Sequence, residues 1–199
     1  MIGILNYGSG NIKSLSNALS EINIKHKIVT NYKNLKHNSK LIIPGVGAYS
    51  HAMKKIIKAK FFSEIKEFAI KKPILGICVG MQILSEFGRE IEYCEGLKIV
   101  KGSVNKINEK ENISHVGWNS VSIIKKNILF KNINNGCDFY FVHSYCFNLE
   151  NHKEETSYVK FDDKKIVSSV EKNNIFGVQF HPEKSHKNGL KVLLNFSNL

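Results

Sequence analysis

The chain has 199 residues, 42% of them hydrophobic and 23% charged, a composition that fits one globular α/β domain and excludes a disordered or fibrous protein. The formal charge of +12 comes from lysines scattered along the chain, with Arg89 the only arginine; because Lys lacks the bidentate fork that reads bases and phosphates, we expect a solvated basic surface and no nucleic-acid partner. The start of the chain has no basic segment, and no apolar run approaches the roughly 18 residues of a membrane span, which favours a cytoplasmic location.

Strands and helices are predicted to alternate through the first half of the chain, as in a parallel α/β sheet. Short apolar stretches rich in β-branched residues indicate buried strands. One helix is indicated by Ile12, Leu15 and Leu19, which recur at the spacing of a helical face. The expected strands cover residues 1–7, 26–30, 41–43 and 74–77, and the expected helices cover residues 11–22, 48–58, 61–70 and 79–87.

After Gly96 the pattern changes to shorter alternating stretches, which predict further strands and a closing helix. The strands are expected at residues 99–107, 116–124, 139–145, 157–161, 166–171 and 175–180, the helix at 189–196, and surface loops at 108–112 and 150–156. No repeat, low-complexity tract or linker marks a boundary. We therefore expect residues 1–199 to form a single α/β domain, with an open mixed, largely parallel sheet flanked by helices, of the flavodoxin-like kind.

One cysteine lies in a motif that indicates a nucleophile. No pair of cysteines has the C-x-x-C spacing of a metal site, and a domain of this size needs no disulfides, so we expect reduced thiols. Gly76-Ile77-Cys78-Val79-Gly80 is G-x-C-x-G at a predicted strand-to-helix junction, the thiol counterpart of a nucleophile elbow. The glycines permit a sharp turn, and the N–H groups that start the next helix favour a thiolate and a developing oxyanion. Taken alone, the motif leaves open a small buried structural cysteine.

A histidine and a glutamate follow the last predicted strand. Residues 176–183 read F-G-V-Q-F-H-P-E, an apolar strand that ends in H-P-E. Side chains two residues apart in an extended segment face the same side, and Pro182 keeps His181 extended. Glu183 can then fix the tautomer of His181, which leaves the other ring nitrogen to exchange a proton with Cys78. Since open α/β sheets build their sites at the carboxyl ends of strands, we interpret Cys78, His181 and Glu183 as a catalytic triad rather than as structural residues.

These motifs resemble those of the class-I, triad-type glutamine amidotransferases. The resemblance covers nearly the whole chain, and within the family it is most similar to the glutaminase subunits of imidazole glycerol phosphate synthase. The shared strings are L-G-I-C-V-G-M-Q at 75–82, F-H-P-E at 180–183, N-Y-G-S-G-N at 6–11, P-G-V-G-A at 44–48, H-V-G-W-N at 115–119 and Y-F-V-H-S-Y at 140–145. One departure is Ser114, at a position where the family usually has proline.

The resemblance implies a mechanism and a set of site residues. Cys78 would attack the side-chain amide of L-glutamine and form a glutamyl thioester, and the ammonia would pass to a β/α-barrel cyclase subunit that forms imidazole glycerol phosphate in histidine biosynthesis. The implied oxyanion hole is Gly45, Val46, Gly47 and Val79, the implied glutamine-binding residues are Gly47, Gln82, Ser144 and Tyr145, and the implied partner interface and ammonia exit are Asn11, Trp118, Tyr140 and Lys184. No metal or organic cofactor is implied. Residues outside the triad have ordinary alternatives, such as a core aromatic for Trp118 and a solvated lysine for Lys184.

Other functions stay open from the sequence. A paralogous glutaminase could supply ammonia to a sugar amidotransferase of surface-polysaccharide synthesis, and a pyridoxal phosphate synthase glutaminase is also short but lacks the 7–11 opening. A non-catalytic regulatory α/β module is the alternative of another class, and the intact triad argues against it. Gly8-Ser9-Gly10 mimics a dinucleotide-binding motif, but Lys13 stands where the third glycine would fall, so we expect no nicotinamide or flavin site. With one domain taken by the glutaminase, we expect the acceptor reaction on another chain.

Overall fold

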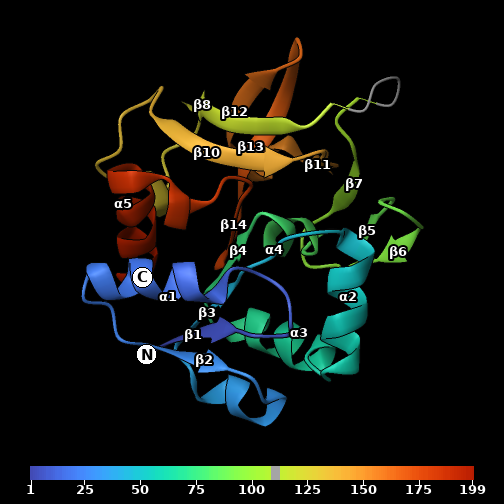
Figure 1. Ribbon diagram of the computed structural model, residues 1–199, viewed down its shortest axis with the longest axis vertical. Helices are drawn as coiled ribbons and strands as arrows, with labels where there is room; N and C mark the ends of the chain where they lie inside the picture. Colours follow the sequence, from blue (N-terminus) through green and yellow to red (C-terminus); the bar gives the residue numbers. More distant parts are fainter. Residues whose placement is uncertain (109–112) are drawn as a thin grey trace.

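A parallel core sheet positions the rest of the molecule. The computed structural model describes residues 1–108 and 113–199. Within these residues one sheet of eight strands has the order β2-β1-β3-β4-β14-β13-β12-β9; β2 to β14 in this order are parallel, and the last three strands are added by antiparallel pairing (Figure 1). The strands are β1 (Ile2–Leu5), β2 (His26–Val29), β3 (Lys40–Ile43), β4 (Ile74–Ile77), β9 (Ser122–Ile123), β12 (Glu155–Phe161), β13 (Lys164–Lys172) and β14 (Ile175–Val178). The predicted fold class is confirmed.

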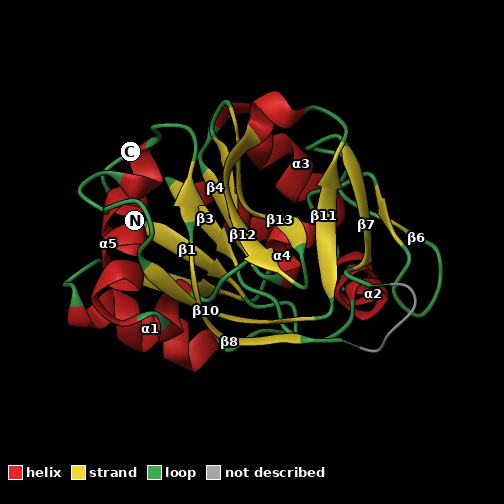
Figure 2. Cartoon of the chain, turned by 90° about the horizontal axis from the view of Figure 1, so that it is seen from above, coloured by secondary structure: helices red, strands yellow, loops and turns green. Residues whose placement is uncertain are grey.

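Helices cover both faces of this sheet. Figure 2 shows α1 (Ile12–Glu21) beside α5 (His186–Ser197) on one face, with α2 (Tyr49–Lys58) and α3 (Phe62–Lys71) on the other. Asn11 caps α1, because its side chain accepts a hydrogen bond from the N–H of Ser14 at 3.2 Å. Short 3₁₀ turns lie at η1 (Tyr32–His37), η2 (Ile128–Phe130), η3 (His152–Glu154) and η4 (Pro182–Lys184).

Two smaller sheets in the described part of the chain stand apart from the main sheet, where the sequence predicted only one. β8 (His115–Ser120) pairs with β10 (Asp138–His143). In the other sheet β11 (Tyr145–Leu149) pairs with β7 (Gly102–Lys106), β7 pairs with β5 (Phe87–Gly88), and β5 pairs with β6 (Cys94–Glu95). The predicted strand 139–145 divides at Ser144, so its two parts join different sheets. The break lets both parts bury aromatic rings, since Phe141 of β10 and Phe147 of β11 are at most 1% exposed.

The helix predicted at 79–87 is wrong in its second half. The observed helix α4 (Val79–Gln82) ends early. The carbonyls of Ile83 and Leu84 accept hydrogen bonds from the N–H groups of the segment 97–100 at 2.8–3.0 Å. Because these tertiary hydrogen bonds use the acceptors that a longer helix would need, the chain leaves the helix.

The two predicted surface loops have different outcomes. The loop predicted at 150–156 is wrong at its end, because Glu155 and Thr156 belong to β12 and are buried. Residues 109–112 of the other loop lie outside the described residues, so that loop stays a prediction.

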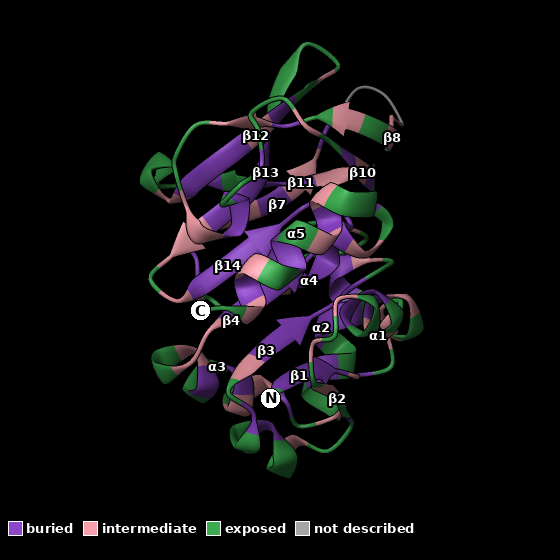
Figure 3. Ribbon diagram, turned by 90° about the vertical axis from the view of Figure 1, so that its left-hand side faces the viewer, coloured by how far each residue is buried: buried purple, intermediate pink, exposed green. Residues whose placement is uncertain are grey.

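A large cluster of buried side chains fills the space between the main sheet and its helices, as Figure 3 shows by colour. It extends from Ile2 in β1 to Phe196 in α5. In the described residues no helix has the length and apolar character to cross a membrane. At the centre of the sheet Val178 pairs with Ile77, so the segments that follow β4 and β14 leave the sheet at the same edge.

Candidate active site

Cys78 occupies a strained turn between β4 and α4. Its φ is +53° and its ψ is −115°, a conformation that an L-residue adopts only where the surroundings hold it. The N–H of Cys78 donates to the carbonyl of Val178 at 2.8 Å, which ties the turn to β14. A β carbon at Gly76 would lie 2.5 Å from the carbonyl oxygen of Gly80, and one at Gly80 would overlap the carbonyl oxygen of Ile43. The turn therefore requires both glycines.

His181 and Glu183 form a buried pair next to this turn. Nδ1 of His181 lies 2.8 Å from Oε1 of Glu183, and both side chains are at most 4% exposed. β14 ends at Val178, two residues before the predicted end at 180, and η4 begins at Pro182. His181 is extended, with φ −96° and ψ 97°. The pairing thus arises from a turn after an extended residue rather than from alternation along one strand.

Opposing effects set the charge state of His181. Burial lowers its pKa, but hydrogen bonding and charge interactions with Cys78 and Glu183 outweigh burial and raise the pKa to about 10, against an ordinary value of 6.5. The buried Nε2 atom has no hydrogen-bond partner among the described residues. The imidazole that faces the sulfur is therefore protonated at neutral pH, which suits it to stabilise a thiolate and to donate a proton.

The raised pKa of His181 predicts a pH-dependent stability. The unfolded chain loses this proton near pH 6.5, whereas the folded chain keeps it to about pH 10. The stabilising contribution is therefore complete below pH 6.5 and is lost as the pH rises through 10. We expect the difference in free energy of unfolding between wild type and His181→Asn, measured by urea titration, to shrink over this window. A difference that stays constant across it would contradict the assigned charge state.

The thiol lines a small pocket of about 130 Å³. This volume is below that of most cofactor sites and suits a small substrate. The lining brings Cys78 and His181 together with six residues that the sequence implied, namely Val46, Gly47, Val79, Gln82, Ser144 and Tyr145. Gly45 instead packs against the elbow, where an added β carbon would lie 2.6 Å from the nitrogen of Gly80.

Two carbonyl groups of the loop 44–47 accept hydrogen bonds from side chains that follow β1. Oη of Tyr7 donates to the carbonyl of Pro44 at 2.9 Å, and Oγ of Ser9 donates to the carbonyl of Val46 at 2.9 Å. Burial raises the pKa of Tyr7, which therefore stays a neutral donor. Gly47 has a φ of +85°, in the left-handed region that favours glycine.

Glu90 and His143 also line the pocket, and the sequence analysis missed both. Oε2 of Glu90 accepts a hydrogen bond from the N–H of Tyr49 at 2.8 Å, and burial raises the pKa of this carboxyl group. Nδ1 of His143 donates to the carbonyl of Tyr145 at 2.9 Å, and burial lowers the pKa of His143 to about 3, so it is neutral. The position of His143 within Y-F-V-H-S-Y was a usable signal, whereas Glu90 lies in a charged segment that resembles ordinary surface.

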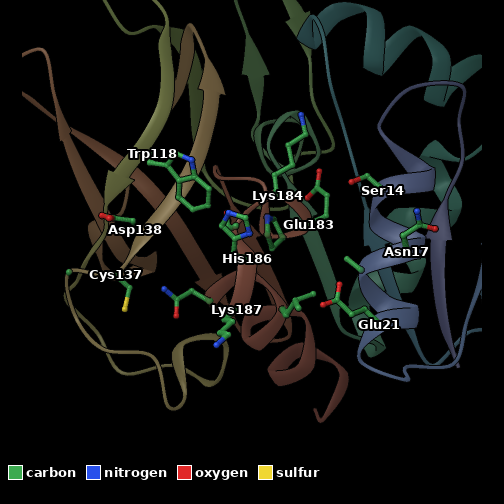
Figure 4. Close-up of a pocket in the computed structure, with 16 residues that line it drawn as sticks. Ser14, Asn17, Glu21, Trp118, Cys137, Asp138, Glu183, Lys184, His186 and Lys187 are labelled. Carbon is green, nitrogen blue, oxygen red and sulfur yellow. The ribbon is translucent and has the colours of Figure 1, made fainter.

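Two of the four residues implied at the partner interface, Trp118 and Lys184, line a separate groove, whereas Asn11 and Tyr140 lie outside its lining. The rings of Trp118 and Tyr140 are 6.0 Å apart, and Nζ of Lys184 lies 5.5 Å from the centre of the Tyr140 ring. A groove of about 990 Å³ runs from Trp118 and Lys184 to Ser14 of α1 (Figure 4). Asn11 caps that helix. The groove also contacts Glu183 from the side away from the thiol pocket.

An α/β sheet that presents a cysteine turn to a histidine–glutamate pair has the arrangement of cysteine-dependent acyl-transfer enzymes. Residues 3–198 match the family described as glutamine amidotransferase class-I. The chain belongs to the class-I glutamine amidotransferases, among the relatives of the HisH subunits of imidazole glycerol phosphate synthase. The family and the enzyme class predicted from the sequence are confirmed.

Two relatives and one solved structure illustrate the likeness. Imidazole glycerol phosphate synthase subunit HisH 1 of Campylobacter jejuni subsp. jejuni is 43% identical over 204 residues, with 100% of each chain covered. The HisH subunit of Caldanaerobacter subterraneus subsp. tengcongensis is 44% identical over 200 residues, with 100% of this chain and 98% of that one covered. A structure of PurLQS from Thermotoga maritima matches with a TM-score of 0.78 at 21% identity, over 99% of this chain and 97% of that one, which shows the fold alone.

Proposed function

We propose that this chain is the glutaminase subunit of imidazole glycerol phosphate synthase, which hydrolyses L-glutamine and passes ammonia to a cyclase subunit. The main support is the position of Cys78 at a small pocket that it shares with His181, whose ring is held by Glu183. Identities of 43% and 44% over the full length to proteins named as that subunit support the pathway. We also propose that residues 1–199 form one domain, which the buried cluster from Ile2 to Phe196 supports.

Glutamine hydrolysis follows from the proton on His181. The Cys78 thiolate attacks the δ-carbon of the glutamine side chain, and the amide oxygen becomes an oxyanion. Protonated Nε2 of His181 gives its proton to the departing nitrogen, so ammonia leaves and a glutamyl thioester remains. Water then gives a proton to neutral His181 while its oxygen attacks the thioester. The thiolate is expelled, glutamate forms, and the new carboxyl group loses its proton to solvent.

The oxyanion would be held by backbone N–H groups. Val79 lies in the first turn of α4, where N–H groups have no acceptor within the helix. The second donor in this proposal comes from the loop 45–47, after rotation of a peptide group that Gly47 makes feasible. Each donor contributes about 3 kcal/mol of transition-state stabilisation in comparable acyl-transfer sites.

Glutamine recognition would use the polar groups of the pocket. Glu90 is the carboxylate among the lining residues, and we assign it the α-ammonium group of glutamine. Gln82 uses its Nε2 for the carbonyl of Tyr145 at 2.9 Å and for Oε1 of Gln179 at 3.0 Å, so only its Oε1 is left for a ligand. Oγ of Ser144, a proposed binding residue, lies 2.7 Å from Oγ of Ser114. Ser114 is the residue that stands where the family usually has proline.

The cyclase would dock over the groove next to Glu183. Helix α1, which Asn11 caps, forms one wall of this groove. Trp118 is 48% exposed and stacks on His186 with ring centroids 4.9 Å apart. An exposed aromatic side chain is a common anchor of protein interfaces. Tyr140 lies on β10 between this groove and Val142. The carbonyl oxygen of Val142 is 3.9 Å from the Cys78 sulfur. The ammonia would therefore move along β10 from the thiol pocket to the groove.

Stimulation by the partner tests the proposed function. We expect the purified chain to release glutamate slowly alone and about 5- to 150-fold faster with the cyclase and its acceptor substrate, the usual range of coupling between two sites. Glutamate release is measured with each component left out in turn. An equal rate in all mixtures would argue against this partner, and stimulation by a sugar amidotransferase instead would indicate the paralogous function.

A pair of surface variants locates the docking face. Trp118→Glu is expected to weaken cyclase binding by about 2 kcal/mol, as loss of an interface anchor does. Ile70→Glu on α3 makes the same kind of change at a residue that is 75% exposed on another part of the surface, and it should leave binding unchanged. Titration calorimetry measures both. Equal binding by the two variants would rule out this groove as the docking face.

A further inference from the structure

Two buried side-chain amides, those of Gln179 and Gln82, form a hydrogen-bonded series that leads from the Cys78 sulfur into the interior. Nε2 of Gln179 lies 3.6 Å from Sγ of Cys78, and Oε1 of Gln179 lies 3.0 Å from Nε2 of Gln82. Nε2 of Gln82 also lies 2.9 Å from the carbonyl oxygen of Tyr145. Gln179 is fully buried and Gln82 is 2% exposed. None of the reaction steps above gives Gln179 a role.

The orientation of the Gln179 amide is fixed by its neighbours. The carbonyl of Tyr145 can only accept, so Gln82 must point its NH₂ group toward it. The same NH₂ group then faces Gln179, which must present its carbonyl oxygen to Gln82. As a result the NH₂ group of Gln179 points at the sulfur of Cys78, and the reverse orientation would place two oxygens in contact.

A second series of hydrogen bonds holds the carbonyl of Tyr145, to which the Gln82 amide donates. Nδ1 of His143 donates to the Tyr145 carbonyl at 2.9 Å, so Nε2 of His143 accepts from Nδ1 of His115 at 3.1 Å. Nδ2 of Asn119 then donates to Nε2 of His115 at 3.1 Å. Burial lowers the pKa of both histidines, so both are neutral and each ring has one donor. The Tyr145 carbonyl thus receives two hydrogen bonds and cannot turn away.

We propose that Gln179 is a catalytic residue that stabilises the Cys78 thiolate. Its N–H donates to the sulfur from a buried position, where a hydrogen bond to an anion is stronger than in water. The interaction favours the thiolate before attack and again when the sulfur leaves the thioester. This role rests on the proposed glutaminase function, and it adds a donor that acts on the nucleophile rather than on the substrate oxyanion.

The test is the pH dependence of Cys78 alkylation by iodoacetamide in the full chain, without glutamine. Gln179→Met removes the donor with an unbranched side chain that fits the same space. Gln179→Glu keeps an acceptor for Gln82 but turns a carboxylate toward the sulfur. We expect the pH midpoint of alkylation to rise by about one unit in Gln179→Met, which lowers the reactivity about tenfold at pH values below the wild-type midpoint, and to rise further in Gln179→Glu.

Asn148→Asp is the matched control for charge. Asn148 is exposed on β11 and already accepts a hydrogen bond from Cys146, so the substitution adds one negative charge and keeps the acceptor. It should leave the midpoint unchanged. An unchanged midpoint in Gln179→Met would overturn the proposal, as would an equal rise in Asn148→Asp. A rise confined to Gln179→Glu would also overturn it, because charge repulsion alone would then explain the result.

A measurement on the wild type covers the case in which the variants do not fold. The chain contains only two glutamines, Gln82 and Gln179, so their side-chain NH₂ signals are readily assigned by NMR. The Gln179 signal should shift with the same pH midpoint as Cys78 alkylation, and a signal that ignores this titration would overturn the proposal. Neither readout needs glutamine or a partner, so failed glutamate release would refute the proposed function and leave this result standing.

Discussion

Cys78→Ala is expected to abolish glutamine-dependent turnover by the assembled complex, by at least about four orders of magnitude, the scale seen when a hydrolase loses its nucleophile. The reason is that no other side chain in the pocket can form the thioester. Synthesis from added ammonia should persist at the wild-type rate, because ammonia then reaches the acceptor site without glutamine. The assay compares product formation with glutamine and with ammonium salt.

A second thiol provides the control for this experiment. Cys94 is a free, partly exposed cysteine in β6, away from the pocket lining. Cys94→Ala should keep both activities. If Cys78→Ala lost the ammonia-dependent synthesis together with the glutamine-dependent one, the division of labour between two subunits would be wrong.

Gly80→Ala is expected to lower the free energy of unfolding by about 2–4 kcal/mol, although alanine normally favours a helix over glycine by about 1 kcal/mol. The added methyl group would overlap the carbonyl oxygen of Ile43, a backbone atom that cannot turn aside. Relief requires movement of α4 away from β3, and that movement carries Cys78 with it. Glutamate release should therefore fall together with stability, as measured by urea unfolding and by the stimulated assay.

Gly136→Ala separates this effect from an ordinary loss of glycine. Gly136 has a φ of +80° and nothing within 4 Å of an added β carbon. The substitution therefore costs only the strain of a left-handed conformation, about 1–2 kcal/mol. Because Gly136 lines the proposed docking groove, activity is compared without the cyclase, and glutamate release per folded molecule should be unchanged. Equal stability of Gly80→Ala and wild type would mean that the contact with Ile43 relaxes freely and does not hold the elbow.

The first half of the fold and the triad motifs were accessible from the sequence because both depend on local pattern. The strand at Ile74–Ile77, Cys78 between two glycines, and the helix that begins at Val79 form one continuous segment. Side-chain spacing and glycine placement specify such a segment without reference to the rest of the chain. The same holds for α1, whose apolar spacing and Asn11 cap are both visible in the sequence.

Errors arose where hydrogen bonds between distant segments outweigh local pattern. The segment after Gln82 reads as a helix, but its carbonyls accept from the segment 97–100. The strand predicted at 139–145 divides because its two ends bury side chains in different sheets. Neither partner is evident from spacing, since both pairings depend on which segments meet after folding.

The sequence alone determined the family, the α/β class and the cysteine, histidine and glutamate motifs, because each is written in a few neighbouring residues. Only the tertiary structure decided which other groups share the pocket. Glu90 has no distinctive sequence context, and Gln179 lies beside the F-H-P-E motif without a sign of its own role. Folding places Glu90 in the lining of the pocket and the Gln179 amide 3.6 Å from the Cys78 sulfur. A hydrogen bond between residues about a hundred positions apart is fixed by packing of the whole domain, which no local pattern encodes.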